Sequence, residues 1–130
     1  MQAPRFIEKE MVFAIHTRQL EKFGGTPGLR DAGLLDSALA QPQATFSGEL
    51  LHPTIAEQAA AYLYHLAMNH PFIDGNKRTA FAVMDTFLRV NGYVLTLTNE
   101  QAYDLVLQVV ERKLDKAGFM AELAKAVQEA

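Results

Sequence analysis

The residues from His70 to Phe81, HPFIDGNKRTAF, combine a histidine with cations at the expected start of a helix. A histidine has an ordinary pKa near 6.5, so it can act as a general base close to neutral pH. Lys77 and Arg78 would stand in the first helical turn, where each positive charge opposes the helix macrodipole by about 0.3–1 kcal/mol. That placement favours an anionic ligand, and the free amides of a helix start already bind phosphate. The stretch therefore predicts a site for phosphoryl or nucleotidyl transfer.

The other polar residues of this stretch each allow a structural use beside a catalytic one. Asp74 could cap the helix or form an Asp-Gly turn, and it could equally hold a Mg²⁺ ion that bridges nucleotide phosphates. Gly75 permits a positive φ or the close approach of a ligand. Asn76 could cap the helix or donate its amide to a phosphate oxygen. Lys77 and Arg78 suit phosphate, but they could also pair with nearby carboxylates at a solvated helix start.

His70 has its own structural alternative, because a histidine at a helix end can bind the last-turn carbonyl groups with its ring. Combined with an anion-binding turn, the role of general base is favoured. Phe72 and Ile73 are expected to insert into the core and so to fix the distance between the base and the cations. An alanine at position 70 is expected to abolish transfer while sparing the fold.

Length and composition are those of a single domain spanning residues 1–130. Hydrophobic residues make up 49% of the chain and charged residues 21%, and there is no cysteine for disulfides or thiolate metal sites. The net charge of −3 argues against a broad nucleic-acid surface. We find neither an apolar run of ~18 residues nor the apolar core of a signal peptide. We therefore expect a cytoplasmic protein that binds neither nucleic acid nor a membrane directly.

Motifs of several other enzyme classes are missing from the sequence. His16, His52 and His65 show no metal-binding spacing, and there is no HExxH, no GxxxxGK[ST] and no GxGxxG. The glycine-rich stretch 24–28 lacks the basic residue of a phosphate-binding loop and is interpreted as turns that end a helix.

Helical periodicity dominates the elements that must position the motif. Pro71 should end the preceding helix at about Asn69, and Thr54 with Glu57 forms a capping box at its start. Residues 43–52 allow a loose hairpin or flap, and 93–97 alternate weakly enough to be extended. The expected fold class is all-α, a single domain of about six helices with a short flap or β-hairpin insertion. The expected helices cover about residues 7–22, 34–40, 55–69, 76–90, 98–113 and 116–128.

HPFIDGNKRTAF resembles the motif of the Fic/Doc superfamily, and its lysine at the eighth position resembles the Doc (death-on-curing) toxins of type II toxin–antitoxin systems. The resemblance extends over residues 10–92, about two thirds of the chain. It includes Phe23–Leu29, which is similar to the loop after the first Doc helix, and the segments 35–39 and 42–46, which lead into the flap.

The resemblance implies an all-helical fold, ATP with Mg²⁺ as the bound nucleotide, and a protein hydroxyl as the acceptor. By motif position it implies that His70 is the general base and that Asp74 holds Mg²⁺. The anion hole would be formed by Gly75, Asn76, Lys77 and Arg78, of which the two cations also count as catalytic. The flap, around residues 43–51, would align the target by main-chain pairing.

The chain departs from the adenylylating Fic pattern at two positions. That pattern has glycine where this chain has Lys77, and a second arginine where it has Phe81. Both changes favour the Doc kinases, which transfer the γ-phosphate. The resemblance then implies a threonine or serine of elongation factor Tu as target, so that translation stops. The self-inhibitory motif [ST]xxxE[GN] is not completed, since Gln101 follows Thr96–Glu100 and Lys22 follows Thr17–Glu21. Inhibition is therefore expected in trans, from an antitoxin.

Two alternatives to a Doc-type kinase stay open at this point. One is a Fic-type adenylyltransferase, which would transfer AMP instead of phosphate. The other is a catalytically silent module that only binds a partner. The joint presence of His70, Asp74, Asn76 and Arg78 weighs against the silent module.

Overall fold

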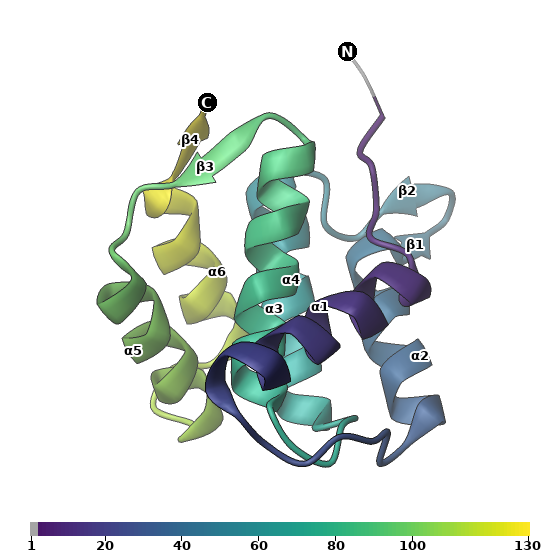
Figure 1. The fold of residues 1–130 in the computed structure, drawn as a ribbon. Helices are drawn as coiled ribbons and strands as arrows, with labels where there is room; N and C mark the ends of the chain where they lie inside the picture. Colours follow the sequence, from purple (N-terminus) through teal and green to yellow (C-terminus); the bar gives the residue numbers. More distant parts are fainter. Residues whose placement is uncertain (1–2) are drawn as a thin grey trace.

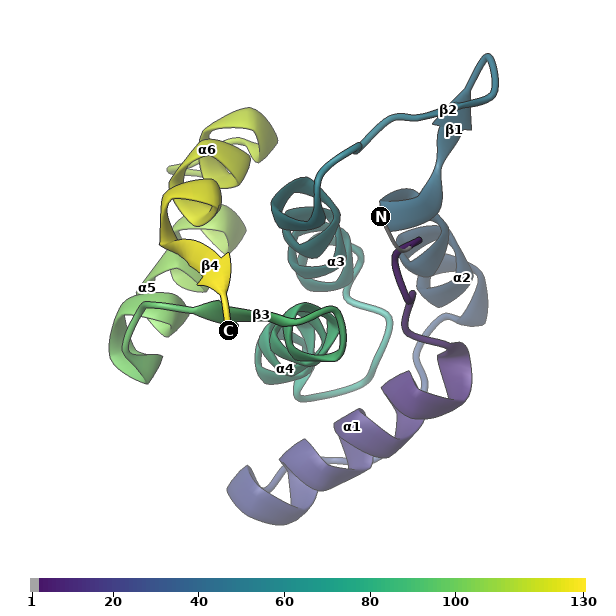
Figure 2. The ribbon, with the colours of Figure 1, turned by 90° about the horizontal axis from the view of Figure 1, so that it is seen from above.

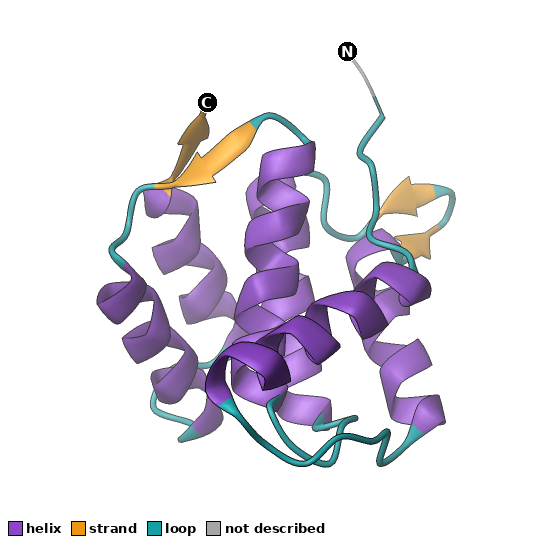
Figure 3. Ribbon diagram, in the orientation of Figure 1, coloured by secondary structure: helices purple, strands orange, loops and turns teal. Residues whose placement is uncertain are grey.

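The computed structural model of the protein describes residues 3–130, most of which are helical (Figure 1, Figure 3). In chain order the elements are α1 (Lys9–Phe23), α2 (Ala32–Ala40), the short 3₁₀ helix η1 (Gln41–Gln43), β1 (Thr45–Phe46), β2 (Glu49–Leu50), α3 (Ile55–Asn69), α4 (Asn76–Val90), β3 (Tyr93–Leu95), α5 (Asn99–Val110), α6 (Lys116–Ala126) and β4 (Val127–Glu129). The strands form only two small antiparallel pairs, β1 with β2 and β3 with β4. The expected all-α fold of about six helices with a short hairpin is confirmed.

The helices α3 and α4 lie side by side at the centre, and the other helices surround them (Figure 2). The second helix and α6 pack against α3, whereas α1 crosses α4. The core between them contains large side chains that are fully buried, among them Tyr62, Phe72, Phe87 and Phe119. Apolar burial of this kind contributes roughly 25 cal/mol per Å² and is the main driving force for the arrangement. The site motif is therefore anchored to the two most central helices.

The ends of α3 follow local sequence chemistry. The Thr54 hydroxyl accepts a hydrogen bond from the Glu57 amide at 3.1 Å and donates one to the Glu57 carboxylate at 2.9 Å. The helix ends at Asn69, as the following proline predicts. His70 does not become extended, however: it adopts the left-handed conformation, with φ 54° and ψ 53°.

The hairpin at residues 43–52 is present, with Thr45 opposite Leu50 and Phe46 opposite Glu49. Ser47 and Gly48 form its turn with positive φ values of 53° and 81°. We call residues 43–51 the flap.

The C-terminal end of the chain differs from the sequence-based expectation. The last helix was expected to run to residue 128, but it ends at Ala126 and is followed by β4. This strand pairs with β3, and the Ala126 carbonyl accepts bonds from both the amide and the hydroxyl of Thr96, at 2.7 and 2.9 Å. Pairing with β3, a strand distant in the sequence, thus ends α6 at Ala126. The preceding helix, α5, also ends earlier than expected, at Val110 rather than about Lys113.

Within residues 3–130, no helix has both the length and the apolar character needed to span a lipid bilayer.

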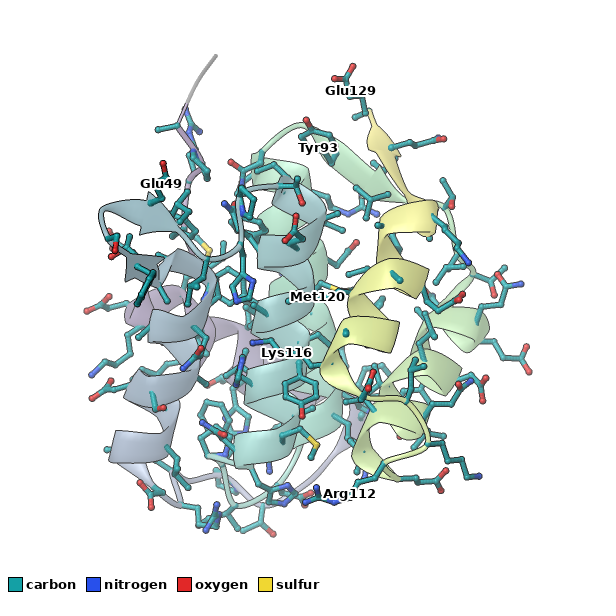
Figure 4. The ribbon with its side chains drawn as sticks, turned by 180° about the vertical axis from the view of Figure 1, so that it is seen from behind. Glu49, Tyr93, Arg112, Lys116, Met120 and Glu129 are labelled. Atoms are coloured by element: carbon teal, nitrogen blue, oxygen red, sulfur yellow. The ribbon has the colours of Figure 1, made fainter. Side chains whose placement is uncertain are left out.

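Three basic groups meet where the flap returns to α3. His52 is buried and directly follows the flap, and His65 lies on α3. Lys116 begins α6 and lies on the face turned toward α3 (Figure 4). Burial, followed by the charges of Lys116 and His52, lowers the pKa of His65 to about 4. Burial also lowers the pKa of His52, although the nearby Glu57 partly opposes this. Both imidazoles are therefore neutral at pH 7.

We expect stability to fall as the pH drops from about 6.5, the ordinary pKa of histidine, to about 4. In that range the unfolded chain binds a proton at His65 and the folded chain does not, so protonation favours unfolding. Because the ring is only partly buried, the free energy of unfolding falls by about 1–2 kcal/mol, less than the full pKa shift of His65 would give. Urea unfolding of the wild type and His65→Gln at pH 7 and pH 4.5 measures it. Equal losses in the two proteins would contradict the assignment to His65.

Candidate active site

The motif residues lie at the junction between α3 and α4, beside the loop that joins α1 to α2 (Figure 1). His70, Asp74 and Arg78 are exposed there, and Lys77 and Gly75 are half-buried. Phe72 is buried as expected, but the expectation for Ile73 was wrong, because its side chain is 51% exposed. Of these two residues, only Phe72 thus attaches the turn to the core.

The main chain at His70 is held by an arginine from outside the motif. The Arg30 guanidinium donates to the His70 carbonyl at 2.6 Å and to the Asn69 carbonyl at 2.9 Å. A non-glycine residue in the left-handed region costs on the order of 1–2 kcal/mol, so external bonds of this kind are needed to maintain it. The positive charge also complements the C-terminal end of the α3 dipole. The structural alternative for His70 was that its ring binds these carbonyls. Within residues 3–130, the Arg30 guanidinium binds them instead.

The glycine-rich stretch 24–28 does more than end α1. Its first residue, Gly24, closes the helix as predicted, with its amide bonded to the Leu20 carbonyl at 2.7 Å. The loop then runs alongside the motif: the Ile73 amide donates to the Gly28 carbonyl at 3.0 Å, and the Arg30 amide donates to the Pro71 carbonyl at 2.7 Å. Sequence reasoning did not predict these two hydrogen bonds, which fix the turn from the side of the loop.

The Asp74 carboxylate joins the loop to the turn. One oxygen accepts from the Thr26 amide at 3.1 Å, and the other accepts from the Gly75 amide at 2.9 Å. These two bonds, Thr26 first, hold the pKa of Asp74 below its ordinary value, and the nearby His16 and His70 act in the same direction. Asp74 does not cap α4, because Gly75 is the N-cap residue and no side chain caps the helix. Its carboxylate instead accepts from the amide of the glycine that directly follows it. The exposed carboxylate is ionised at neutral pH.

An ionised, exposed carboxylate fits a hard cation such as Mg²⁺. Within residues 3–130, no group of three or more histidine or acidic residues could hold a metal alone. Magnesium that arrives with a nucleotide needs only one or two protein carboxylates, because phosphate oxygens and water supply the other ligands. The residues present therefore fit a nucleotide-bound magnesium ion and do not fit an independent metal centre.

Asn76 has a role that the sequence did not predict. Its side chain is only 4% exposed, and it forms two hydrogen bonds with the main chain of Phe72: the Phe72 amide donates to Oδ1 at 2.9 Å, and Nδ2 donates to the Phe72 carbonyl at 2.9 Å. Asn76 is not the helix cap, because Gly75 is the N-cap residue and no side chain caps α4. The expected donation of its amide to a phosphate oxygen stays a prediction. The Asn76 side chain thus closes the turn between His70 and α4, and its main-chain amide at the helix start is free for an anion.

The start of α4 leaves donors available. Gly75 is the N-cap residue in the left-handed conformation, with φ 76°, and no side chain caps the helix. The first amide bonded within the helix is that of Thr79, which donates to the Gly75 carbonyl at 3.0 Å. Helix geometry therefore leaves the amides of residues 76–78 free of main-chain partners. In residues 3–130, neither Lys77 nor Arg78 forms a salt bridge.

Two aromatic rings hold the Arg78 guanidinium. It lies 3.8 Å from the ring centre of Phe23 and 5.4 Å from that of Tyr103. The three side chains line a groove of about 810 Å³ between α1, α4 and α5. Arg18 and Lys22 add positive charge to the same groove. Sequence reasoning identified Arg78 but not these rings, since their contact depends on how α1 and α5 dock.

A second histidine, His16 of α1, also reaches the motif. It is 5% exposed, and its Nε2 lies 2.8 Å from the Asp74 carbonyl oxygen. His16 was not expected at the site, because it has no metal-binding spacing in the sequence. The available indication was its position four residues after Val12, since these two residues form the buried face of α1.

Comparisons with known proteins agree with this geometry. A family model described as the Fic/DOC family matches residues 6–88, well over half of the chain. Toxin Doc of Mycolicibacterium smegmatis is 47% identical over 104 residues, which cover 78% of this chain and 80% of that protein. Protein kinase doc of Escherichia phage P1 is 36% identical over 88 residues, which cover 68% of this chain and 69% of that protein. The motif, the helical fold of the described residues and these matches together show that the chain belongs to the Fic/DOC family.

Proposed function

We propose that the protein is a Doc-type kinase toxin that transfers the γ-phosphoryl group of ATP to a serine or threonine hydroxyl of a target protein. The observation that supports this best is the joint placement of an exposed imidazole, an ionised carboxylate and free helix-start amides in one turn. One relative is named a toxin and the other a protein kinase. Following the resemblance, we propose elongation factor Tu as the target, so that phosphorylation stops translation in the cytoplasm.

Each residue would have a defined task in this reaction. The His70 imidazole would take the proton of the acceptor hydroxyl while the hydroxyl oxygen forms a bond to the γ-phosphorus. The bond between the γ-phosphorus and the ADP oxygen would break, and ADP would leave. Asp74 would hold Mg²⁺, which neutralises charge on the phosphate oxygens. The amides of residues 76–78, together with Lys77 and Arg78, would bind the phosphates. Phosphoryl transfer depends mostly on positioning and charge stabilisation, so this set is sufficient.

The two departures from the adenylylating pattern support γ-transfer over AMP transfer. Phe81, which stands where that pattern has an arginine, packs against the core and offers no donor. The half-buried Lys77 stands where a glycine would leave the main chain open to a phosphate. Within the motif, the nucleotide would therefore meet one arginine side chain, that of Arg78.

The flap would align the target. Its strands are only two residues long, and β1 is exposed on both residues, with Phe46 74% exposed. An exposed strand edge can accept an extended segment of another protein through main-chain hydrogen bonds. We propose that the segment carrying the acceptor hydroxyl pairs with this edge.

An antitoxin would act at the groove beside Arg78. Its lining contains more cations than carboxylates and includes the ring of Tyr103, so it matches an acidic, amphipathic segment. The cations are Arg18, Lys22, Arg78 and Arg89, and the carboxylates are Asp85 and Glu100. The C-terminal segment of an antitoxin, folding as it binds, would cover Arg78 and neutralise the protein in trans.

Labelled ATP separates the candidate functions. The protein is incubated with elongation factor Tu, Mg²⁺ and ATP that carries the label at either the γ- or the α-phosphate. Label from the γ-position alone is expected, whereas label from the α-position would establish adenylyl transfer. No transfer, together with no ATP binding by calorimetry with or without Mg²⁺, would indicate a silent binding module. Growth arrest on expression, relieved by the neighbouring gene product, would support the toxin–antitoxin assignment.

A further inference from the structure

The side chain of His16 lies outside the motif but is bonded to it at the residue proposed to hold Mg²⁺. A carbonyl oxygen only accepts hydrogen bonds, so at 2.8 Å from the Asp74 oxygen the Nε2 atom of His16 carries a proton and donates it. The imidazole also stacks on the Phe72 ring, with the ring centres 3.8 Å apart and an angle of 10° between the planes. His16 is 5% exposed, so the neighbouring groups fix its position.

The bonded carbonyl belongs to the peptide group between Asp74 and Gly75. Because a peptide group is planar, the direction of the Asp74 carbonyl determines the direction of the Gly75 amide on the other side. That amide donates to the Asp74 carboxylate at 2.9 Å. A bond from His16 to the carbonyl therefore also sets the orientation of the carboxylate.

Gly75 makes such a restraint necessary. Its φ is 76°, and glycine adopts positive and negative φ values about equally readily. The residue itself therefore does little to hold the peptide in place. The space on the α1 side is limited: a Cβ atom at Gly75 would lie 3.3 Å from Leu20 and 3.7 Å from His16 Nε2. On this side of the turn, the restraint on the Asp74–Gly75 peptide thus comes from α1, which packs on α4.

We propose that His16 is a positioning residue that fixes the Asp74–Gly75 peptide and thereby the carboxylate that holds Mg²⁺. This inference rests on the proposed function for its catalytic consequence. The neutral imidazole with its proton on Nε2 and the imidazolium both donate this bond, so the role does not depend on a change of charge. Partners of this outer-shell kind typically change metal affinity by about 10–100-fold when they are removed.

Two substitutions separate the hydrogen bond from the packing. His16→Phe retains the stacking on Phe72 and removes the donor, whereas His16→Gln retains an amide donor near the position of Nε2 and removes the stacking. For His16→Phe we expect the Mg²⁺ concentration at half-maximal γ-phosphate transfer to rise about 10-fold, with little change in melting temperature. For His16→Gln we expect most of the Mg²⁺ response to be restored, despite a lower melting temperature. A role in packing alone predicts the opposite order.

A second measurement does not need activity. In nucleotide-free protein, the ¹H–¹⁵N resonance of the Gly75 amide should shift and become more temperature-dependent in His16→Phe, and it should stay near the wild-type position in His16→Gln. Wild-type behaviour of this resonance in His16→Phe would overturn the inference, even if the enzyme is active. Failure of the wild type to transfer phosphate would instead reject the proposed function, and the Gly75 resonance would still decide whether His16 fixes the peptide.

Discussion

Replacing His70 with asparagine is expected to lower phosphoryl transfer by about 10²–10⁴-fold, the range of a lost general base. Asparagine cannot take up the proton, but it tolerates the left-handed conformation that position 70 adopts, with φ 54°. The fold and the bonds from Arg30 to the main chain should therefore survive. Single-turnover incorporation of γ-labelled phosphate into elongation factor Tu measures the effect, and thermal unfolding checks the fold.

His70→Ala provides the comparison for this experiment. Alanine also lacks a base, but it adopts the left-handed region less readily than asparagine. We expect the same loss of transfer, with a melting temperature lower than that of His70→Asn. Transfer within a few-fold of wild type in the well-folded asparagine variant would show that the imidazole is not the base.

Replacing Arg78 with alanine is expected to weaken ATP binding and to lower turnover by about 10²–10³-fold, the loss typical of one donor to a charged transition state. Arg78 forms no salt bridge in residues 3–130, and its guanidinium is held against Phe23 at 3.8 Å. It is therefore a positioned cation that remains free to bind phosphate. Calorimetry with ATP and Mg²⁺ measures binding, and the label assay measures turnover.

Two further variants test whether the shape of this side chain matters as well as its charge. Arg78→Lys retains the charge but loses the planar fork, so we expect it to recover only a small part of the activity. Arg5→Ala removes an exposed arginine from the N-terminal segment and should leave transfer at the wild-type level. Full activity of Arg78→Ala would contradict the proposed phosphate site.

The features that the sequence predicted well are those determined by neighbouring residues. Thr98 and Gln101 form the capping box that their spacing predicts, with bonds of 3.0 and 3.1 Å. The end of α3 at Asn69 follows from Pro71, and Asn91 follows the last residue of α4 as expected. Caps and proline effects act within one helical turn, so they can be predicted without knowledge of the fold.

The features that sequence reasoning missed depend on partners distant in the chain. The strand β4 exists because β3 is there to pair with it. Arg30 and His16 contact the motif only after α1 and its loop dock against α4, which no local pattern reveals. Asn76 is a different case, since its partner Phe72 is only four residues away. An asparagine can donate its amide to phosphate or form hydrogen bonds with the main chain. Asn76 is only 4% exposed, which favours the second use.

The bonds that complete the turn come from segments 40, 48 and 58 positions away from it. The chemical groups at 70–78 thus lie close together in sequence, while their final alignment is a long-range product of folding. Contacts of high sequence separation form late, because chain closure must precede them. A growing or partly opened chain that has α3 and α4 but lacks a docked α1 retains the Asn76–Phe72 bonds but lacks these three long-range restraints on the turn. Local detachment of a single peripheral helix would then switch the enzyme off well short of global unfolding.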